Sequence, residues 1–487
     1  MIRRVGVVGA GTMGAGIAQV AALGGLETVL HDPIPEALEG GAAKLREALA
    51  KGAERGRWSS DDAEAAAARI ENAAELAGLA GCDLVVEAAP EDLELKRELF
   101  AKLAAHCGEQ TILATNTSSL SVTAIAAGVP NPERVVGMHF FNPPALMKLV
   151  EVVAAPDSAE EAARRMGRTP VRAADEIGFV ANRCARPFSL EALRLYGDRV
   201  AEPETIDRIC RIGGGFRMGP FELTDLVGVD VNLSVARSFW EQSFHEPRWQ
   251  PHPIQQRMVD AGRLGRKSGR GYYSYEGGGP YRPDDPAAPE LSTEAPSVVI
   301  EGDGDLADTL RERAGSESGA PRAVLLAEGS LAELDEAGGA VGFHLLGPLE
   351  DATMVELTAG DFAPEQDRRA VEAFFRGLGL HTEWVGDAPG LVLGRIVCQL
   401  VNEAAFALQK GVGSAEDIDT AMKLGFNYPR GPLEWGDRIG LDHVLAVLDA
   451  LQDELGEERY RAAPQLRRMV DEGRLGRSTG EGFFRAG

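Results

Sequence analysis

Residues 4–16 read RVGVVGAGTMGAG, a pattern from which the fold of the N-terminal region can be predicted. The apolar run RVGVV is typical of a short buried strand. The glycine-rich turn GAGTMG follows at 9–14 and opens an alanine-rich helix. Such a turn lets a pyrophosphate approach the N-terminus of the helix. The next predicted strand ends at Asp32, a carboxylate placed to accept hydrogen bonds from ribose hydroxyls.

These residues predict a dinucleotide site rather than a purely structural glycine turn. The Asp32 carboxylate would repel a 2′-phosphate, and Pro33 and Ile34 stand where an arginine would favour NADP, so NAD is the expected cofactor. The predicted cofactor contacts of this region are Gly9, Gly11, Thr12, Met13, Gly14 and Asp32.

Strands and helices continue to alternate up to about residue 183, with further strands expected at 82–88 and over TILATN and RVVGMHFF. Alternation of this kind predicts an α/β Rossmann domain with a doubly wound parallel sheet. From 185 to about 275 the pattern is mostly helical, and a loop rich in glycine and proline follows. We therefore expect an all-α domain after the Rossmann domain.

The two-domain unit is duplicated within the chain. GFVANR at 178–183 matches GLVLGR at 390–395, and RMVDAGRLGRKSGRGYY matches RMVDEGRLGRSTGEGFF further along each copy. Repeats of this length indicate duplication. The predicted domains are a Rossmann domain at 1–184, a helical copy 1 at 185–280, a linker with a truncated, degenerate Rossmann-like domain at 281–388, and a helical copy 2 at 389–487.

A histidine in the apolar strand VGMHFFNP, 136–143, is the candidate general base. On its own, His139 reads as a core residue, and a buried serine or asparagine usually satisfies backbone groups. Together, however, His139, Glu151, Ser118 and Asn182 supply a base, a carboxylate for the imidazolium and donors for a developing alkoxide. Oxidation of a hydroxyl to a ketone requires this set.

Six motifs together resemble the NAD-dependent (S)-3-hydroxyacyl-CoA dehydrogenase family over residues 1–275. They are GAGTMGAGIA, NTSSLSVT, GMHFFNPPALMKLVEVV, GFVANR, GPFELTDLVG and GRKSGRGYY. The resemblance implies oxidation of a 3-hydroxyacyl-CoA to a 3-oxoacyl-CoA, with His139 as base and Glu151 as its partner. It also implies that Ser118 and Asn182 bind the substrate oxygen and carbonyl.

The resemblance implies further contacts with the cofactor and with CoA. The family's cofactor contacts correspond to Glu91, Lys96, Asn116, Ser118, Asn142 and Lys267. CoA phosphates require a local basic surface, and the predicted helical stretch 44–57 carries five Lys and Arg residues. Lys44 and Lys51 are the expected contacts there, and a solvated charged helix is the alternative.

The second histidine stretch, VGFHLLGP at 341–348, keeps His344 and Glu356 at the spacing of His139 and Glu151. Its surroundings differ, because Gly394 replaces Asn182 and Ala323 lies as far before His344 as Ser118 does before His139. Ser330 fits the serine position only if a loop has shortened. The stretch 298–308 echoes the glycine turn, but three aspartates there would repel pyrophosphate. We therefore predict that this second stretch is the remnant of an active site that no longer works. The chain should then bind one NAD.

Composition limits the remaining function classes. A formal charge of −25 argues against nucleic acid, and five scattered cysteines suit a reducing compartment without a disulfide framework. Neither a membrane span nor a signal peptide is read from the sequence, no metal site is indicated, and cytoplasm is the expected location. The resemblance implies that single-copy relatives dimerise through their helical domains, so we expect the two helical copies to form an internal pseudo-dimer, in a monomer or a homodimer.

Two alternatives from the sequence stay open. One is a related sugar-acid dehydrogenase of the gulonate type, which shares the His, Glu and Ser set but uses no CoA. The other is a noncatalytic NAD-binding scaffold. The domain order also resembles a bacterial branch of the family associated with phenylacetate catabolism and 3-hydroxyadipyl-CoA, whereas 3-hydroxybutyryl-CoA or general fatty acid beta-oxidation are the other substrate assignments.

Overall fold

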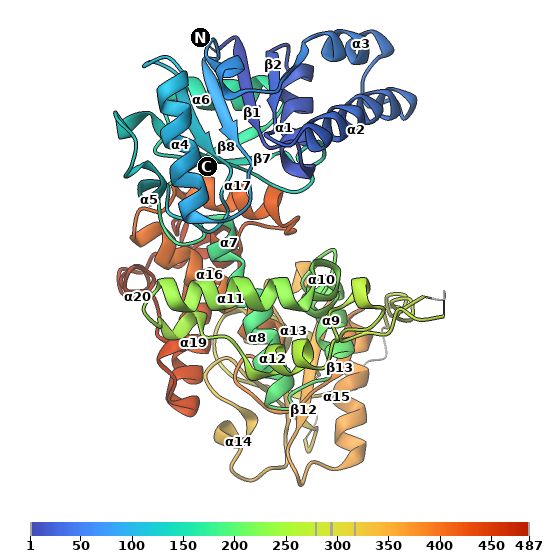
Figure 1. Cartoon of the computed structure of the whole chain (residues 1–487). Coiled ribbons are helices and arrows are strands. Elements are labelled where there is room, and N and C mark those ends of the chain that lie inside the picture. The colour runs from blue at the N-terminus through green and yellow to red at the C-terminus, as the bar shows by residue number, and fades with distance from the viewer. Residues whose placement is uncertain (1, 278–279, 293–295, 316–317, 486–487) are drawn as a thin grey trace. The chain divides into compact units, whose positions relative to one another are not determined.

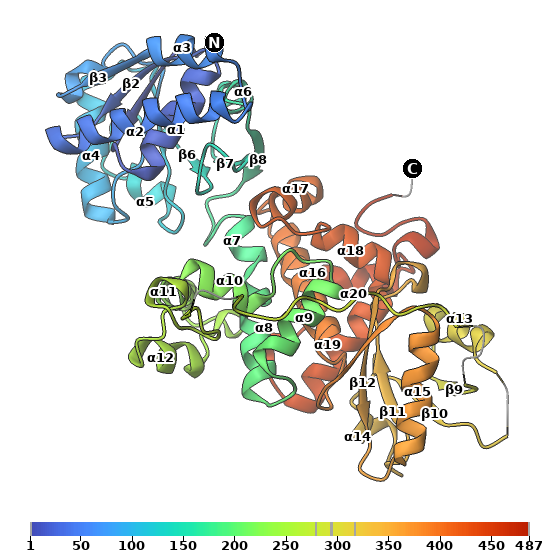
Figure 2. The same ribbon diagram turned by 90° about the vertical axis from the view of Figure 1, so that its right-hand side faces the viewer.

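The computed structural model describes residues 2–277, 280–292, 296–315 and 318–485. They form two compact units (Figures 1 and 2). Unit 1 combines Met1–Arg183 with Gly411–Phe426, and unit 2 combines Cys184–Lys410 with Asn427–Gly487. The segment 411–426 belongs by sequence to helical copy 2, yet it packs into the unit that contains the glycine turn.

Among the described residues, unit 1 holds an eight-stranded sheet in the order β3-β2-β1-β4-β5-β6-β7-β8. All neighbouring strands are parallel except β6 and β7, which are antiparallel. Most strand residues are buried, as expected for a parallel sheet covered on both faces. The strands are β1 (Arg4–Val8), β2 (Glu27–His31), β3 (Ile70–Ala73), β4 (Leu84–Glu87), β5 (Ile112–Thr115), β6 (Val135–Phe140), β7 (Leu149–Val153) and β8 (Thr169–Ala173).

Helices cover this sheet, and their starting points follow local sequence signals. Ser59 begins α3 with a capping box to Asp62, and the Asp92 side chain accepts a hydrogen bond from Leu95 N at the start of α4. The helices of unit 1 are α1 (Thr12–Leu23), α2 (Pro35–Glu54), α3 (Ser60–Ala68), α4 (Leu93–His106), α5 (Val122–Ala126), α6 (Asp157–Arg165), α7 (Ala181–Cys184) and α17 (Ala415–Gly425). Helix α17 lies beside β7 and β8 (Figure 1).

Unit 2 contains the helices of copy 1 and, apart from α17, those of copy 2. Helix α8 of copy 1 packs along α16, its counterpart in copy 2. Arg395 on α16 reaches Glu191 on α8, with Nε 3.1 Å from the carboxylate. The helices are α8 (Arg186–Gly197), α9 (Pro203–Ile212), α10 (Pro220–Val227), α11 (Val229–Gln242) and α12 (Pro253–Asp260) from copy 1, and α16 (Leu393–Gln409), α18 (Pro432–Ile439), α19 (Leu441–Leu455) and α20 (Pro464–Asp471) from copy 2.

A smaller sheet in unit 2, with its helices, forms a lobe that repeats part of the sheet of unit 1. Within the part of the chain that the structure describes, its five strands run in the order β13-β12-β11-β10-β9, and β11 and β12 are antiparallel as β6 and β7 are. Helix α15 covers this sheet (Figure 2). The elements are β9 (Val299–Glu301), β10 (Arg322–Leu325), β11 (Val341–His344), β12 (Met354–Ala359), β13 (His381–Trp384), α13 (Asp305–Arg313), α14 (Leu331–Leu334) and α15 (Glu365–Gly377).

The order of the strands corrects the reading of residues 298–308 as a worn glycine turn. Strand β9 lies next to β10, where β4 lies next to β5 in unit 1, so β9 holds the position of β4 and not of β1. A short apolar strand followed by glycine fits either position in the sequence. The described lobe therefore corresponds to the β4–β8 half of the larger sheet, without the half that carries the glycine turn.

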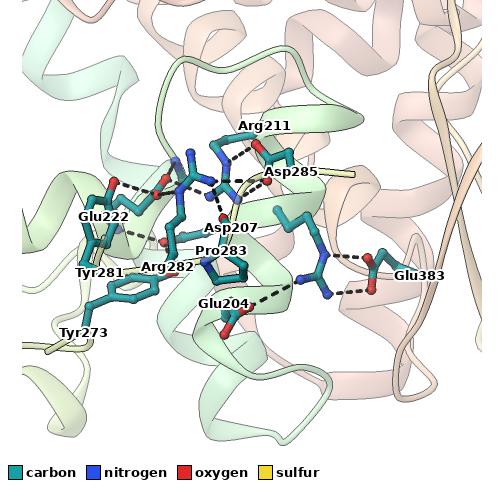
Figure 3. A network of polar contacts seen from close by, with 12 residues as sticks. Glu204, Asp207, Arg211, Glu222, Tyr273, Tyr281, Arg282, Pro283, Asp285 and Glu383 are labelled. Carbon is teal, nitrogen blue, oxygen red and sulfur yellow. Dashed lines mark hydrogen bonds and ion pairs between the residues drawn. The ribbon is translucent and has the colours of Figure 1, made fainter. Parts of the chain in front are cut away.

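Ion pairs fix the segment that follows helical copy 1 (Figure 3). Arg282 Nε donates to Glu222 Oε1 at 2.6 Å, and Asp285 accepts two hydrogen bonds from Arg211, at 2.6 and 3.0 Å. Arg211 Nη1 also donates to Glu222 Oε2 at 2.8 Å. Residues 281–285, predicted as part of a linker, thus follow a defined path over α9 and α10.

None of the helices within the described ranges is long and apolar enough to span a membrane.

Candidate active site

The glycine turn has the geometry of a phosphate-binding turn. Gly9 has a φ of +98°, which favours glycine, and a Cβ at Gly14 would lie 1.7 Å from the Gly9 carbonyl oxygen. At Gly11 a Cβ would meet no atom within 4 Å, so open space lies in front of the N-terminus of α1. Thr12 and Met13 form the first turn of that helix. These features fit the pyrophosphate of NAD.

Asp32 stands directly after β2 and faces the glycine turn. Its Oδ2 accepts a hydrogen bond from Ala10 N at 2.9 Å, and its Oδ1 accepts one from Ile34 N at 3.0 Å. The two amides hold the carboxylate beside the turn while it stays partly exposed. A ribose bound along the turn would find this carboxylate as an acceptor for its hydroxyls.

Replacing Asp32 with alanine should reduce the preference for NAD over NADP about tenfold or more, since a hydrogen bond to a charged group contributes roughly 1.5–3 kcal/mol. The measurement is kcat/KM for each cofactor. Glu27→Ala is the matched control, because Glu27 begins the same strand and is exposed. An unchanged ratio in Asp32→Ala would show that Asp32 does not face the ribose.

His139 and Glu151 lie opposite each other on the antiparallel pair β6 and β7. The imidazole Nδ1 lies 2.7 Å from Glu151 Oε2, and both side chains are buried. Glu151 Oε1 accepts hydrogen bonds from the amides of Val180 and Ala181 at 2.9 and 2.8 Å. A carboxylate held in this way favours the tautomer with a proton on Nδ1, which leaves Nε2 as a proton acceptor.

Ser118 and Asn116 lie at the carboxyl edge of the sheet, where His139 also lies. Strands β5 and β6 are parallel neighbours, so the residues that follow β5 meet the end of β6 at this edge. Asn116 Oδ1 accepts a hydrogen bond from Phe140 N at 2.8 Å and ties the two strand ends together. Asn182 lies on α7 next to Ala181, and the amide of Ala181 donates a hydrogen bond to Glu151. The structure thus gathers the four predicted catalytic residues at one edge of unit 1.

Glu91 organises the loop that carries Ser118. Its Oε1 accepts hydrogen bonds from the Thr117 hydroxyl at 2.6 Å and from the amides of Ser118 and Ser119 at 3.0 Å. Burial would raise the pKa of Glu91, but these donors and the Lys96 ammonium lower it below its usual value. Glu91 is therefore anionic at neutral pH and positions the serine loop.

Lys96 is buried beneath this loop and makes an ion pair that the sequence did not indicate. Its Nζ lies 2.6 Å from Glu87 Oε1 and 3.5 Å from Glu91 Oε2. Glu87 ends β4, is fully buried, and also accepts a hydrogen bond from the Thr115 hydroxyl at 2.7 Å. The signal that could have revealed Glu87 is an acidic residue ending the apolar strand CDLVVEA.

The remaining predicted contacts lie on exposed surfaces. Lys44 and Lys51 are exposed on α2, whose other face buries Leu45 and Leu49, and Lys51 pairs with Glu47 at 2.6 Å. Asn142 is exposed after β6. Lys267 belongs to unit 2, where its Nζ lies 2.5 Å from Asp230 Oδ1.

The histidine of the lobe has different partners. Glu356 faces His344 in the strand register, but both of its oxygens accept backbone hydrogen bonds, from Val392 N at 2.6 Å and Leu393 N at 2.9 Å. His344 Nε2 instead lies 3.1 Å from Nε2 of His443. A Cβ at Gly394 would lie 2.2 Å from the His344 ring, so an asparagine there could not coexist with this ring position. The loss of the counterpart of Asn182 is coupled to the new place of the imidazole.

Ser330 does not replace Ser118 in the lobe. Its hydroxyl caps α14 by accepting from Glu333 N, as Ser121 caps α5 by accepting from Ala124 N. The amides that follow each cap donate to matching carboxylates, Asp387 and Asp175. Ser330 is therefore the counterpart of Ser121, a structural cap.

The lobe should lose stability in acid because of its two histidines. Burial lowers the pKa of His344 well below 6.5, with a further contribution from His443, and burial lowers the pKa of His443 to about 4. A buried histidine of this kind makes its full contribution to the free energy of unfolding above the pKa of the unfolded chain, about 6.5, and the contribution falls as the pH drops toward 4. At pH 5 the free energy of unfolding is lower by about 2 kcal/mol for one such histidine. Glu356 acts in the opposite direction, because burial raises its pKa to about 8.

The double variant His344→Gln/His443→Gln isolates the histidine contribution to this pH dependence. We expect a smaller difference between its melting temperatures at pH 7 and pH 5 than in the unmodified chain, measured by circular dichroism. Turnover at pH 8 should persist in the folded variant, since neither residue serves the site in unit 1. Loss of turnover in the folded protein would mean that the lobe carries chemistry.

Comparisons with known proteins agree with this geometry. Residues 4–176 match the NAD-binding domain of 3-hydroxyacyl-CoA dehydrogenase, and residues 178–275 and 390–486 both match its C-terminal domain. The chain is 40% identical to 3-hydroxyadipyl-CoA dehydrogenase of Escherichia coli over 96% of this chain and 98% of that protein. It is 41% identical to a probable 3-hydroxybutyryl-CoA dehydrogenase of Deinococcus radiodurans, over 56% of this chain and all of that protein.

A solved structure shares the whole architecture. A crystal structure titled 3-hydroxybutyryl-CoA dehydrogenase from Escherichia coli superimposes with a TM-score of 0.89 at 39% identity, over 97% of this chain and 99% of that one. These matches confirm the predicted family, the Rossmann and helical fold class, and NAD as the cofactor. The chain belongs to the 3-hydroxyacyl-CoA dehydrogenase family of NAD-dependent oxidoreductases.

Proposed function

We propose that unit 1 oxidises the C3 hydroxyl of an (S)-3-hydroxyacyl-CoA, with His139 as the base. The observation that carries the proposal is the hydrogen bond between His139 Nδ1 and Glu151, 2.7 Å long, at the sheet edge that also carries the glycine turn. NAD, when bound, accepts the hydride from C3. The roles of the protein residues follow from where each one lies.

His139 Nε2 takes the hydroxyl proton as the ketone forms, because Nδ1 is already engaged by Glu151. Glu151 stabilises the resulting imidazolium and is itself held by the amides of Val180 and Ala181. Ser118 and Asn182 donate to the C3 oxygen and the thioester carbonyl, where negative charge develops. Glu91 positions Ser118 through its amide.

The cofactor and CoA contacts complete the proposal. Asp32 binds the adenosine ribose, and the cofactor contacts of the family map to Glu91, Lys96, Asn116, Asn142 and Lys267. Lys96 is buried between Glu87 and Glu91, so it supports the cofactor site through those carboxylates. Exposed Lys44 and Lys51 on α2 attract the CoA phosphates.

For the acyl group we infer a six-carbon dicarboxylic chain, as in 3-hydroxyadipyl-CoA. The support is the relative of that name from Escherichia coli, which matches across the lobe and helical copy 2 as well as unit 1. A short monocarboxylic chain, as in 3-hydroxybutyryl-CoA, is the alternative, and the solved structure with the same architecture has that title.

A panel of substrates tests the reaction and the acyl group together. NADH formation is measured with (S)-3-hydroxyadipyl-CoA, (S)-3-hydroxybutyryl-CoA and a longer monocarboxylic thioester, beside the free 3-hydroxy acids and L-gulonate. We expect the largest kcat/KM with the adipyl thioester and little turnover without CoA. Equal rates with free acids, or faster oxidation of gulonate, would favour the sugar-acid alternative. No turnover with any compound would favour the scaffold.

We also infer that the two helical copies act as an internal pseudo-dimer. Helix α8 packs along α16, its counterpart. Helix α9 of copy 1 packs on β12 and β13, and α17 of copy 2 packs on β7 and β8. Each copy thus supplies a helix to the sheet of the other, as two subunits do in a two-fold dimer.

A further inference from the structure

The segment 411–426 comes from helical copy 2 by sequence but belongs to unit 1, where it lies close to the residues that hold the proposed base. Ala174 N donates to the Val412 carbonyl at 2.8 Å. A Cβ at Gly413 would lie 3.1 Å from a methyl group of Val180, the residue whose amide donates to Glu151. The start of this segment therefore contacts Val180, whose amide helps to position the Glu151 carboxylate.

The far end of the same segment contacts the aromatic neighbour of His139. A Cβ at Gly425 would lie 3.3 Å from Phe141 Cε1, so the end of α17 approaches this ring closely. The Phe426 ring lies edge-on to Phe141, with centroids 6.4 Å apart. Phe141 in turn lies 4.5 Å from the centroid of the His139 ring. Two phenylalanine rings thus connect helical copy 2 to the imidazole.

The corresponding positions in the lobe do not carry phenylalanine. Helix α9 approaches β12 as α17 approaches β7, and a Cβ at Gly213 would lie 3.3 Å from Met354 Cβ. The duplication pairs Phe426 with Gly214 and Phe141 with Leu346. The contact between helix and sheet is present on both sides, but of the two pairs of positions it is the one beside His139 that carries two phenylalanines.

We propose that Phe426 is a positioning residue of the active site: it packs against Phe141, and Phe141 holds the His139 imidazole in the orientation that proton removal requires. The proposal rests on the proposed function of His139 as the base. It means that catalysis by the first copy depends on a side chain of the second copy. Small displacements of a reacting group are costly, since about 1 Å can lower a rate by as much as 10²-fold.

Phe426→Ala in the full chain tests this. We expect kcat to fall about tenfold, a fraction of what complete misplacement costs. KM for NAD should stay the same, because the glycine turn and Asp32 are untouched. With substrate deuterated at C3, the isotope effect on kcat should rise as the chemical step becomes slower relative to product release. Phe426→Tyr keeps the ring and should restore both values.

Leu346→Ala is the matched control, because it removes the side chain at the position of Phe141 in the lobe. It should lower the melting temperature to a similar extent and leave kcat unchanged. A normal kcat and isotope effect in Phe426→Ala would overturn the proposal, and so would an equal fall of kcat in Leu346→Ala.

A spectroscopic measurement separates this inference from the proposed reaction. In protein labelled with ¹³C in the histidine rings, the His139 signal, assigned by its absence in His139→Ala, should shift in Phe426→Ala and not in Leu346→Ala. If that shift appears while no hydroxyacyl thioester is oxidised, the positioning contact stands and the proposed reaction fails. If thioesters are oxidised and the signal stays in place, only the role of Phe426 is refuted.

Discussion

His139→Ala should lower turnover by about 10²- to 10⁴-fold while the protein stays folded, because general bases contribute on that scale. The imidazole is the group at this sheet edge whose Nδ1 is bound by a fully buried carboxylate. Removing it leaves the substrate hydroxyl without a proton acceptor, but NAD still binds to the glycine turn. Steady-state NADH formation and NAD titration in the same preparation measure the two effects separately.

His344→Ala is the natural control, since it removes the equivalent histidine from the lobe. It should retain turnover within about twofold, although a buried side chain is lost at a cost of about 1–3 kcal/mol in stability. Near-normal turnover in His139→Ala would exclude its role as base. A matching loss in folded His344→Ala would mean that both copies contribute to the chemistry. NAD titration should give one equivalent per chain, because the described lobe has no counterpart of the glycine turn.

Removing residues 389–487 should cause aggregation or new dimerisation and loss of activity. The deletion takes α16 away from α8 and exposes a buried apolar face, and it also takes α17 from β7 and β8. A large apolar face that becomes exposed to water favours aggregation or pairing with another chain. Light scattering after size exclusion gives the assembly state, and NADH formation gives the activity of each fraction.

Co-expression of 1–388 with 389–487 as separate chains distinguishes lost contacts from a folding defect of the shortened chain. Activity should return in part, at a level limited by association, because the covalent link normally gives the copies a high effective concentration. A monodisperse, fully active monomer of 1–388 would show that helical copy 2 is dispensable.

The placement of the candidate site residues at one edge of the sheet could be predicted from the sequence, because it depends on local signals. The glycine turn, Asp32 and the pair His139 and Glu151 each lie at a strand end or in a fixed strand register, which the chain pattern already specifies. Other contacts could not be found in this way. The pairing of Lys96 with Glu87 depends on how the end of β4 meets α4, and the placement of 411–426 on unit 1 is a tertiary contact with no periodicity.

The lobe shows the same limit in a different form. A short apolar strand before GDGD resembles the start of the glycine turn as well as the end of β4, and only the order of strands in the sheet separates the two. The role of Ser330 likewise follows from two contacts in the structure. Its side chain caps α14, and Asp387 accepts a hydrogen bond from Leu331 N, which lies 56 residues earlier in the chain. Local sequence patterns show that a strand is present, whereas its neighbours in the sheet show which strand of unit 1 it corresponds to.

The exchange of α9 and α17 between the two halves changes how this enzyme can evolve. In a homodimer encoded by one gene, a mutation in the exchanged helix appears on both sides and is tested by selection at two active sites at once. Here the two helices are encoded at separate positions, and the paired residues that follow them already differ, with Phe426 in one copy and Gly214 in the other. Because the two copies of the C-terminal domain stand at separate positions of one chain, either can change in sequence without the other. The described lobe lacks the strands that correspond to β1–β3, while unit 1 keeps them.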